Sequence, residues 1–287
     1  MLKTNADQLV ELAVAGQISA PGYRYPGYSP DNEGKARVLP GMAGVLYNIR
    51  VGDSAFGWAG DHVEPGVSLA SSDLDIDFAL HYLSCIGNRA VVTSGEAKGA
   101  EGIVTGEHAR ILIDFGAEVN DYLCIGDSIQ IRAKGRGLEL SKYPHIHLKK
   151  CSPELISSLP IEQIDDFKIR VPVTMELPVE IMGSGAELNS EYVDQDLMSG
   201  DKALMSELGI DQMKLGDLVA INHADHRFGR GYKEGAVSIA LCIHGDSIMT
   251  GHGPGMLTLM TCPQPAIEWT VDPKANIAHY LGIREAA

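Results

Sequence analysis

The stretch EGIVTGEHARILIDF, residues 101–115, contains two short β-like runs in succession. Isoleucine, valine and threonine, which are enriched in strands, recur in EGIVTG (101–106) and ARILIDF (109–115). Glycine punctuates the first run, as it does at strand ends and turns. This stretch therefore predicts consecutive short strands and favours a β-rich fold.

Runs of the same kind recur on both sides of this stretch. The 32 glycines among 287 residues indicate many turns, which suits short strands. Two prolines in KIRVPVTMELPVEIMG (168–183) indicate an edge strand or a bend. The other predicted strands cover residues 44–50, 78–87, 89–95, 127–133, 216–223, 236–245 and 256–263. We expect a mainly β fold of the α+β class, with two β-rich lobes or barrels and a few short helices.

Three segments are predicted to be helical. TNADQLVELAVAG (4–16) has a capping residue, an apolar face and a glycine at its end. SPELISSL (152–159) has the pattern of a short capped helix. DPKANIAHYLGI (272–283) predicts a final helix, with Asp272 as its N-cap and proline in its first turn.

The acidic stretch IEQIDDF (161–167) is the expected domain boundary. It divides the chain into an N-terminal β-rich domain, 1–165, and a C-terminal β-rich domain, 166–287, each with one terminal helix. Within the first domain, PGYRYPGYSPDNEG (21–34) holds three prolines, three glycines and three tyrosines, a density that excludes regular structure. Such an arm suits a contact between subunits, so we expect a homo-oligomer.

Charge and composition exclude several classes of partner. A net charge of −15 argues against nucleic acid and against an anionic membrane surface. The five cysteines form no CxxC pair and are odd in number, so we expect buried thiols and no disulfide framework. The N-terminus is too polar for a signal peptide, and no apolar run has the length of a membrane span. We expect a cytoplasmic protein with a small-molecule ligand.

Two stretches place imidazole and carboxylate groups side by side. GDHVEPGVS (60–68) has His62 and Glu64 two residues apart, and NHADHRFGRGYKEGAVS (222–238) has His223 and Asp225 at the same spacing. Residues two apart on an extended segment point to the same face, so each pair supplies half of a metal site. The alternative is that these are polar loop residues beside turns. A divalent ion, Zn or Mn, would be held by some of His62, Glu64, His223, Asp225 and His226.

The two stretches also share a local pattern. EPGVSLA (64–70) is similar to EGAVSIA (234–240), which leaves open a chance match or an ancient duplication. On this pattern we expect His62 and His223 to approach one pocket, within one chain or across a subunit contact. Either Glu64 or Glu234 would then be the general base.

A third stretch, IHGDSIMTGHGPG (243–255), has the composition of a ligand-binding loop. Gly251, Gly253 and Gly255 free the backbone N–H groups to converge on an anion, and His252 adds a catalytic candidate. His244 and Asp246 precede this loop and are further candidate ligand contacts. The alternative is a tight connection between strands whose glycines serve only the turn. A separate acidic stretch, DQDLMSGD (194–201), lacks the glycine and glutamate of an EF-hand calcium loop.

GDSAFGWAGDHVEPGVS, GAEGIVTGEHARILIDF, MGSGAELNS and GHGPG resemble a bacterial family catalogued as domain of unknown function 4438, over nearly the whole chain. The resemblance implies a soluble, β-rich, oligomeric protein and implies nothing about a reaction. A fainter likeness to metal-dependent amidases of the acetamidase and formamidase type lies in the Gly-Asp strand openings and His-Gly loops. No catalytic residue is carried over from that likeness.

Three functions remain open on the sequence. The first is a metal-dependent hydrolase or related lyase that acts on a small polar or anionic molecule. The second is a non-catalytic protein that binds a small ligand in the same pocket. The third is a structural homo-oligomer, with the tyrosine-rich arm and glycine-rich loops as assembly surfaces.

Overall fold

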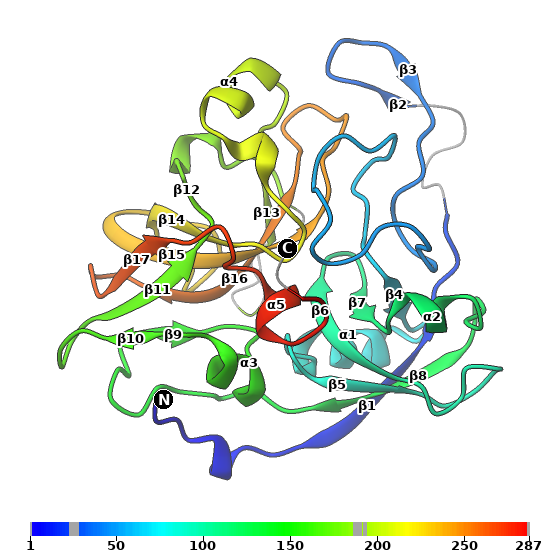
Figure 1. Cartoon of the computed structure of the whole chain (residues 1–287), viewed down its shortest axis with the longest axis horizontal. Coiled ribbons are helices and arrows are strands. Elements are labelled where there is room, and N and C mark those ends of the chain that lie inside the picture. The colour runs from blue at the N-terminus through cyan, green and yellow to red at the C-terminus, as the bar shows by residue number, and fades with distance from the viewer. Residues whose placement is uncertain (1, 23–28, 186–190, 192–193, 286–287) are drawn as a thin grey trace.

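A closed barrel of six strands forms one part of the computed structural model, which describes residues 2–22, 29–185, 191 and 194–285 (Figure 1). Neighbouring strands of the barrel are antiparallel, and the last pairs with the first. The order around the barrel is β1 (Leu12–Ile18), β4 (Val67–Ala70), β7 (Ile111–Asp114), β6 (Glu101–Glu107), β5 (Arg89–Val92) and β8 (Ser128–Ala133).

Alternation along the strands fills the inside of this barrel. In β8 every second side chain is buried, among them Ile131, and in β1 Val14 and Ile18 are buried. At Gly16 a Cβ atom would lie 2.7 Å from the carbonyl oxygen of Ala70, so glycine permits the close approach of β1 to β4.

The second half of the chain forms open sheets beside the barrel (Figure 1). The larger sheet has the order β12 (Met175–Leu177), β14 (Leu218–Ala224), β15 (Tyr232–His244), β16 (Gly255–Cys262) and β13 (Asp194–Asp196), and β9 (His147–Leu148) also pairs with β16. A smaller sheet contains β10 (Glu162–Gln163), β11 (Ile169–Val173) and β17 (Ile267–Val271). β15 is buried from Ala236 to His244, which explains why this run is mostly apolar.

The helices are short. They are α1 (Leu74–Leu83), α2 (Ala117–Asn120), α3 (Pro153–Ser158), α4 (Lys202–Glu207) and α5 (Ile277–Tyr280), with 3-10 turns η1 (Ala6–Gln8), η2 (Val179–Ile181) and η3 (Ile210–Gln212). Across the described ranges, no helix combines the length and apolar character needed to cross a membrane. The prediction of a mainly β fold with a few short helices is confirmed.

Several predicted elements are corrected by the structure. Residues 4–16 form η1 and most of β1, because pairing with β8 on one side and β4 on the other overrides the helical pattern. Most of 78–87 lies in or just after α1, whose N-cap Asp73 accepts the N–H groups of the first turn. Residues 44–50 form a loop with one isolated bridge. The last helix is capped by Asn276 and not by Asp272.

The division at 165/166 stays a prediction. The barrel strands come from residues before it, but β9 and β10 also precede it and pair with strands that follow it. One hydrophobic core runs from the barrel into the larger sheet and includes Ile113, Ile131 and Ile239.

The tyrosine-rich arm is described only in part, since residues 23–28, which hold its three tyrosines, lie outside the described residues. The hairpin β2 (Ser29–Pro30) and β3 (Ala36–Arg37) follows, and the Asn32 N–H in its turn donates to the carbonyl of Ile248 (2.8 Å). The five cysteines are unpaired thiols, and all except Cys124 are buried, as expected.

Candidate metal centre

Four histidines and two aspartates from distant parts of the sequence converge at one place. The loop before β4 crosses the end of β15, where the His62 N–H donates to the carbonyl of Asp246 (3.1 Å). The two aspartates are two residues apart on β13, a spacing that directs both side chains to the same face. The converging residues are His62, His108, His244, His252, Asp194 and Asp196.

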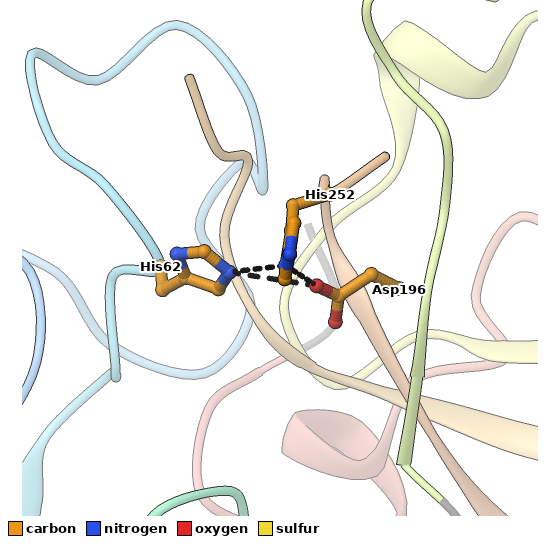
Figure 2. Close-up of side chains that lie close together, drawn as sticks. All are labelled: His62, Asp196 and His252. Carbon is orange, nitrogen blue, oxygen red and sulfur yellow. Dashed lines mark hydrogen bonds and ion pairs between the residues drawn. The ribbon is translucent and has the colours of Figure 1, made fainter. Parts of the chain in front are cut away.

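His62, Asp196 and His252 form the part of this cluster that we call the outer triad. Figure 2 shows the three side chains facing one another from three separate segments. His252 Nδ1 lies 2.6 Å from Asp196 Oδ2 and 3.2 Å from His62 Nε2, and His62 Nε2 lies 3.4 Å from the same oxygen. The His252 side chain is 27% exposed, whereas His62 and Asp196 are buried. The outer triad therefore reaches the surface through His252.

His108, Asp194 and His244 form the inner triad. The His108 and His244 rings are 4.1 Å apart between centroids, and the His62 and His108 rings stack at 5.7 Å, so the two triads adjoin. Each triad offers one ligand atom per residue, and the three atoms lie within 4.8 Å of one another. Nitrogen and carboxylate oxygen at this density are typical donors for a transition-metal ion.

The hydrogen bonding of two buried atoms in the inner triad is incomplete within the described residues. Among the described residues, Asp194 Oδ1 and His244 Nε2 have no hydrogen-bond partner. His244 Nε2 does lie 3.2 Å from Asp196 Oδ1, which is close enough for an ion pair. Burial of unsatisfied polar atoms costs free energy, so a cation or a hydrogen-bond donor at this position would stabilise them.

Three of the histidines are oriented from behind through Nδ1. Asp61 lies 3.3 Å from His62 Nδ1, and Glu64 lies 3.0 Å from His108 Nδ1. The His244 Nδ1 lies 2.9 Å from the backbone carbonyl of the next residue. In each ring Nε2 remains available to the cluster. Acceptors that fix the second ring nitrogen in this way are a regular feature of histidines that bind metals.

These orienting carboxylates are themselves held in place. Asp61 accepts hydrogen bonds from the Ser247 hydroxyl (2.7 Å) and from the backbone N–H of Ile248 (3.1 Å). Glu64 is fully buried and accepts from the Ala43 N–H (2.8 Å) and the Ser68 hydroxyl (2.7 Å). Both oxygens of Glu64 are therefore engaged, and its position is that of a group that orients His108.

The backbone near the cluster adopts conformations that few residues tolerate. His62 has a φ of 49°, in the left-handed region that non-glycine residues seldom occupy. A Cβ atom on Gly255 would lie 2.1 Å from His244 Nε2, so this glycine makes room for the ring. The strained backbone at His62 is of the kind that functional sites commonly hold, and the missing side chain at Gly255 admits the His244 ring to the cluster.

Proton affinities in the cluster differ sharply. Burial alone would lower the pKa of His62, but its contacts with Asp196 and Asp61 outweigh burial and raise the pKa to about 10. Burial raises the pKa of the Asp194 carboxyl to about 7, and it lowers the pKa of His108 to about 4. The pKa of Asp196 lies below its usual range because the adjacent imidazoles outweigh its burial. A cation that entered the cluster would compete with protons.

Anion binding by the loop at 251–255 stays a prediction, and the described hydrogen bonds show how the loop is held in place. The carbonyls of Gly251, His252 and Pro254 accept N–H groups from the segment 184–199. A Cβ atom on Gly253 would lie 2.3 Å from the carbonyl of Leu197, so this glycine serves close packing. The loop thereby holds His252 against Asp196, a carboxylate that favours a cation at this position.

Asp246 lies at the rim of the cluster. It accepts from Lys202 Nζ (2.6 Å) and from the Ser199 hydroxyl, and its carbonyl accepts the His62 N–H. The prediction had grouped Asp246 with His244 as a ligand contact. In the structure His244 belongs to the inner triad, while Asp246 is paired with a lysine.

The second His-x-acid stretch makes different contacts, and the idea that it shares the site within one chain is corrected. His223 Nδ1 accepts the Gly235 N–H (3.0 Å), and Asp225 pairs with Arg227 (2.9 Å). His226 is buried, and its Nδ1 lies 2.7 Å from a threonine hydroxyl of β16. Pairing across a subunit contact stays a prediction.

The physical reason is the length of β15. His223 meets this strand at Gly235, and His244 ends it, so at about 3.3 Å per residue the path between them is roughly 30 Å. Glu234 is exposed at the same far end, and the structure does not bring it to His62. A surface hollow of 360 Å³ is lined in part by Asn222, Gly235 and Trp269 and so belongs to that distant end.

Asp194, Asp196 and His108 were not identified as ligands from the sequence. The two aspartates are spaced like His62 and Glu64, and the same rule for residues two apart on a strand applies to them. In the sequence their stretch invites comparison only with a calcium-binding loop. His108 lies in the short gap between the predicted strands 101–106 and 109–115, a position that gives it no separate signal.

Comparison with known proteins supports the resemblance noted in the sequence. Models for the N-terminal and C-terminal parts of the domain of unknown function DUF4438 match residues 28–157 and 158–281. The crystal structure of TM1086 is similar, with a TM-score of 0.91 and 42% sequence identity over 97% of this chain and 99% of that one. No curated protein shows significant similarity.

Proposed function

The chain belongs to the DUF4438 family, and we propose that this member is a metal-dependent hydrolase whose ion is held by the outer triad. One observation carries the proposal. Two imidazoles and a carboxylate, His62, His252 and Asp196, face one another at contact distance, and one of them is open to solvent.

The donor set fits Zn or Mn. Catalytic zinc sites commonly have three protein ligands of this kind and keep one position for water or substrate. The outer triad supplies three, and its exposed edge at His252 leaves room for a fourth group from solvent. When bound, such an ion lowers the pKa of its water or polarises a carbonyl, which suits hydrolysis or a related lyase reaction.

Neighbouring carboxylates hold the histidine rings of the cluster in the orientation that metal binding requires. Asp61 accepts from His62 and keeps its Nε2 turned toward Asp196. Glu64 had been a candidate base, but its oxygens are occupied and it has no exposed surface. We assign it the orientation of His108 and assign no role to Glu234.

The substrate class is a small polar or anionic molecule. The net charge of −15 disfavours the long-range attraction of anions, so an anionic group needs a local cation. Besides the ion, Lys202 can supply this positive charge, since its side chain is 57% exposed and forms an ion pair with Asp246 at the rim of the cluster.

Turnover with and without metal tests the proposal. The protein is stripped with a chelator and reloaded with Zn or Mn, and a panel of small amides and lactones is screened. We expect turnover only after reloading, a loss of at least about 100-fold in Asp196→Asn, and wild-type behaviour in the matched control Asp225→Asn.

Hydrolysis that persists unchanged in the chelator would overturn the metal-dependent mechanism. Metal binding without turnover of any compound would favour the non-catalytic ligand-binding protein or the structural homo-oligomer. The oligomer itself stays a prediction, and light scattering that gives the mass of one 30.8 kDa chain at micromolar concentration would count against it.

A further inference from the structure

We infer that the inner triad holds a second divalent ion, and that Asp196 bridges it to the ion of the outer triad. This inference rests on the proposed function, because it extends the same metal centre. It assigns His108, Asp194 and His244 as ligands of the second ion.

The unsatisfied atoms of the inner triad are the first reason. Asp194 is 3% exposed and His244 is fully buried, yet Asp194 Oδ1 and His244 Nε2 lack hydrogen bonds within the described part of the chain. In the outer triad, by contrast, His252 and Asp196 bond one another at 2.6 Å. A cation bound by the inner triad would satisfy both atoms at once, which buried polar groups otherwise require of a protein neighbour or water.

The two oxygens of Asp196 are the second reason. Oδ2 faces the outer triad, 2.6 Å from His252 and 3.4 Å from His62. Oδ1 faces the inner triad, 3.2 Å from His244 Nε2. One carboxylate that directs its oxygens to two adjacent ligand groups has the geometry of a bridge, and two-metal sites place their ions about 3.5–4 Å apart.

The surroundings of the two triads assign different roles to the two ions. With Asp196 the inner triad offers four protein ligands, the number that closes a structural zinc site. Asp194 and His244 are buried, the His108 side chain is only 10% exposed, and Glu64 fixes the His108 ring through Nδ1. The outer ion has three protein ligands and access to solvent. We therefore assign the inner ion to positioning Asp196 and to charge balance, and the outer ion to substrate.

Metal stoichiometry tests this assignment. The full-length protein is stripped, reloaded with Zn, freed of loosely bound ions and measured by elemental analysis. We expect two ions per chain in the wild type and in Asp225→Asn. We expect one in Asp194→Asn and one in His62→Asn, because each removes a ligand of a different triad.

A spectroscopic readout on the wild type adds a test that does not depend on any variant folding. In wild-type protein loaded with Mn, two ions sharing a carboxylate give a spin-coupled electron paramagnetic resonance spectrum, and Asp194→Asn should give the spectrum of an isolated ion. One Zn per chain in the wild type, with uncoupled Mn, would overturn the second ion and leave the proposed function standing. No bound metal would overturn both. Two ions retained in Asp194→Asn with an unchanged coupled spectrum would overturn the assignment of the inner ligands.

Discussion

The stretch around His62 and the stretch around His223 look alike in sequence and behave differently in the fold. Around His62, imidazoles and carboxylates arrive from four further segments, and His252 lies 190 positions away along the chain. Around His223, the partners are local, with Gly235 twelve positions away and Asp225 bonded to its near neighbour Arg227. Both stretches have a histidine and an acidic residue at the same spacing, so the two regions differ through the partners that the fold brings from distant parts of the chain.

Charge balance separates the two regions as well. In the second stretch the carboxylate of Asp225 has an arginine partner, so no further cation is needed. In the first, Asp61 and Asp196 contact imidazoles, and Glu64 contacts another. Imidazoles balance carboxylates only when they are protonated, and a divalent ion can take the place of those protons. We infer from this comparison that carboxylates paired only with histidines favour a metal site more strongly than spacing alone does.

The largest expected difference between the two regions concerns metal affinity. Asp196→Asn removes the carboxylate shared by both triads and should weaken Zn binding by at least about 100-fold. Asp225→Asn makes the same chemical change in the other stretch and should leave affinity unchanged. Competition with a chromophoric chelator measures both. Equal loss in the two variants would mean that the second stretch is also part of the site.

An intermediate effect is expected for the groups that orient the rings. Glu64→Gln keeps the size of the side chain but weakens the hydrogen bond that His108 donates, and such changes typically lower metal affinity by about 10–100-fold. Glu234→Gln is the matched control, since Glu234 is exposed at the far end of β15. The same chelator competition gives the answer. Unchanged zinc affinity in Glu64→Gln would mean that Glu64 does not orient His108 for metal binding.

The smallest effect is a pH dependence of stability in the second stretch. Burial lowers the pKa of His226 from its ordinary value to about 4, so the folded protein keeps this ring neutral where the unfolded chain is protonated. The stability that the neutral His226 ring contributes is therefore fully present well above pH 6.5. It is lost as the pH falls toward 4, and the loss is about 1–2 kcal/mol at pH 5.

Urea unfolding of metal-free protein at pH 7.5 and pH 5 measures this loss, with His226→Asn as the comparison. The variant should show a smaller drop between the two pH values than the wild type. An identical drop would mean that His226 is protonated in the fold, which would reopen it as a titrating member of a site.

Much of the strand pattern was accessible from sequence because it is local. The runs 101–106 and 236–245 became β6 and part of β15, as their β-branched composition predicted. The helix predicted for residues 4–16 is wrong. Their apolar spacing suits a helix, but their structure depends on pairing with β8, which lies far along the chain. The strand predicted for residues 78–87 is wrong for the opposite reason, because a local signal, the capping aspartate just before α1, stabilises a helix there.

The candidate site was only partly accessible for a related reason. His62, His244 and His252 stood out because glycine, proline and acidic neighbours surround them in sequence. Asp194 and Asp196 had the right spacing, but nothing local says that β13 would pair with β16 beside His244. Convergence of this kind is set by sheet topology, which composition and periodicity do not encode.

The central claim is that the His62 cluster, and not the His223 stretch, binds a divalent ion. Anomalous diffraction at the zinc edge, from crystals of the zinc-loaded protein, tests it directly. We predict a peak in the outer triad about 2.0–2.2 Å from His62 Nε2, His252 Nδ1 and Asp196 Oδ2. A peak beside His223 and Asp225 instead, or zinc-loaded crystals without a peak at the cluster, would contradict the claim.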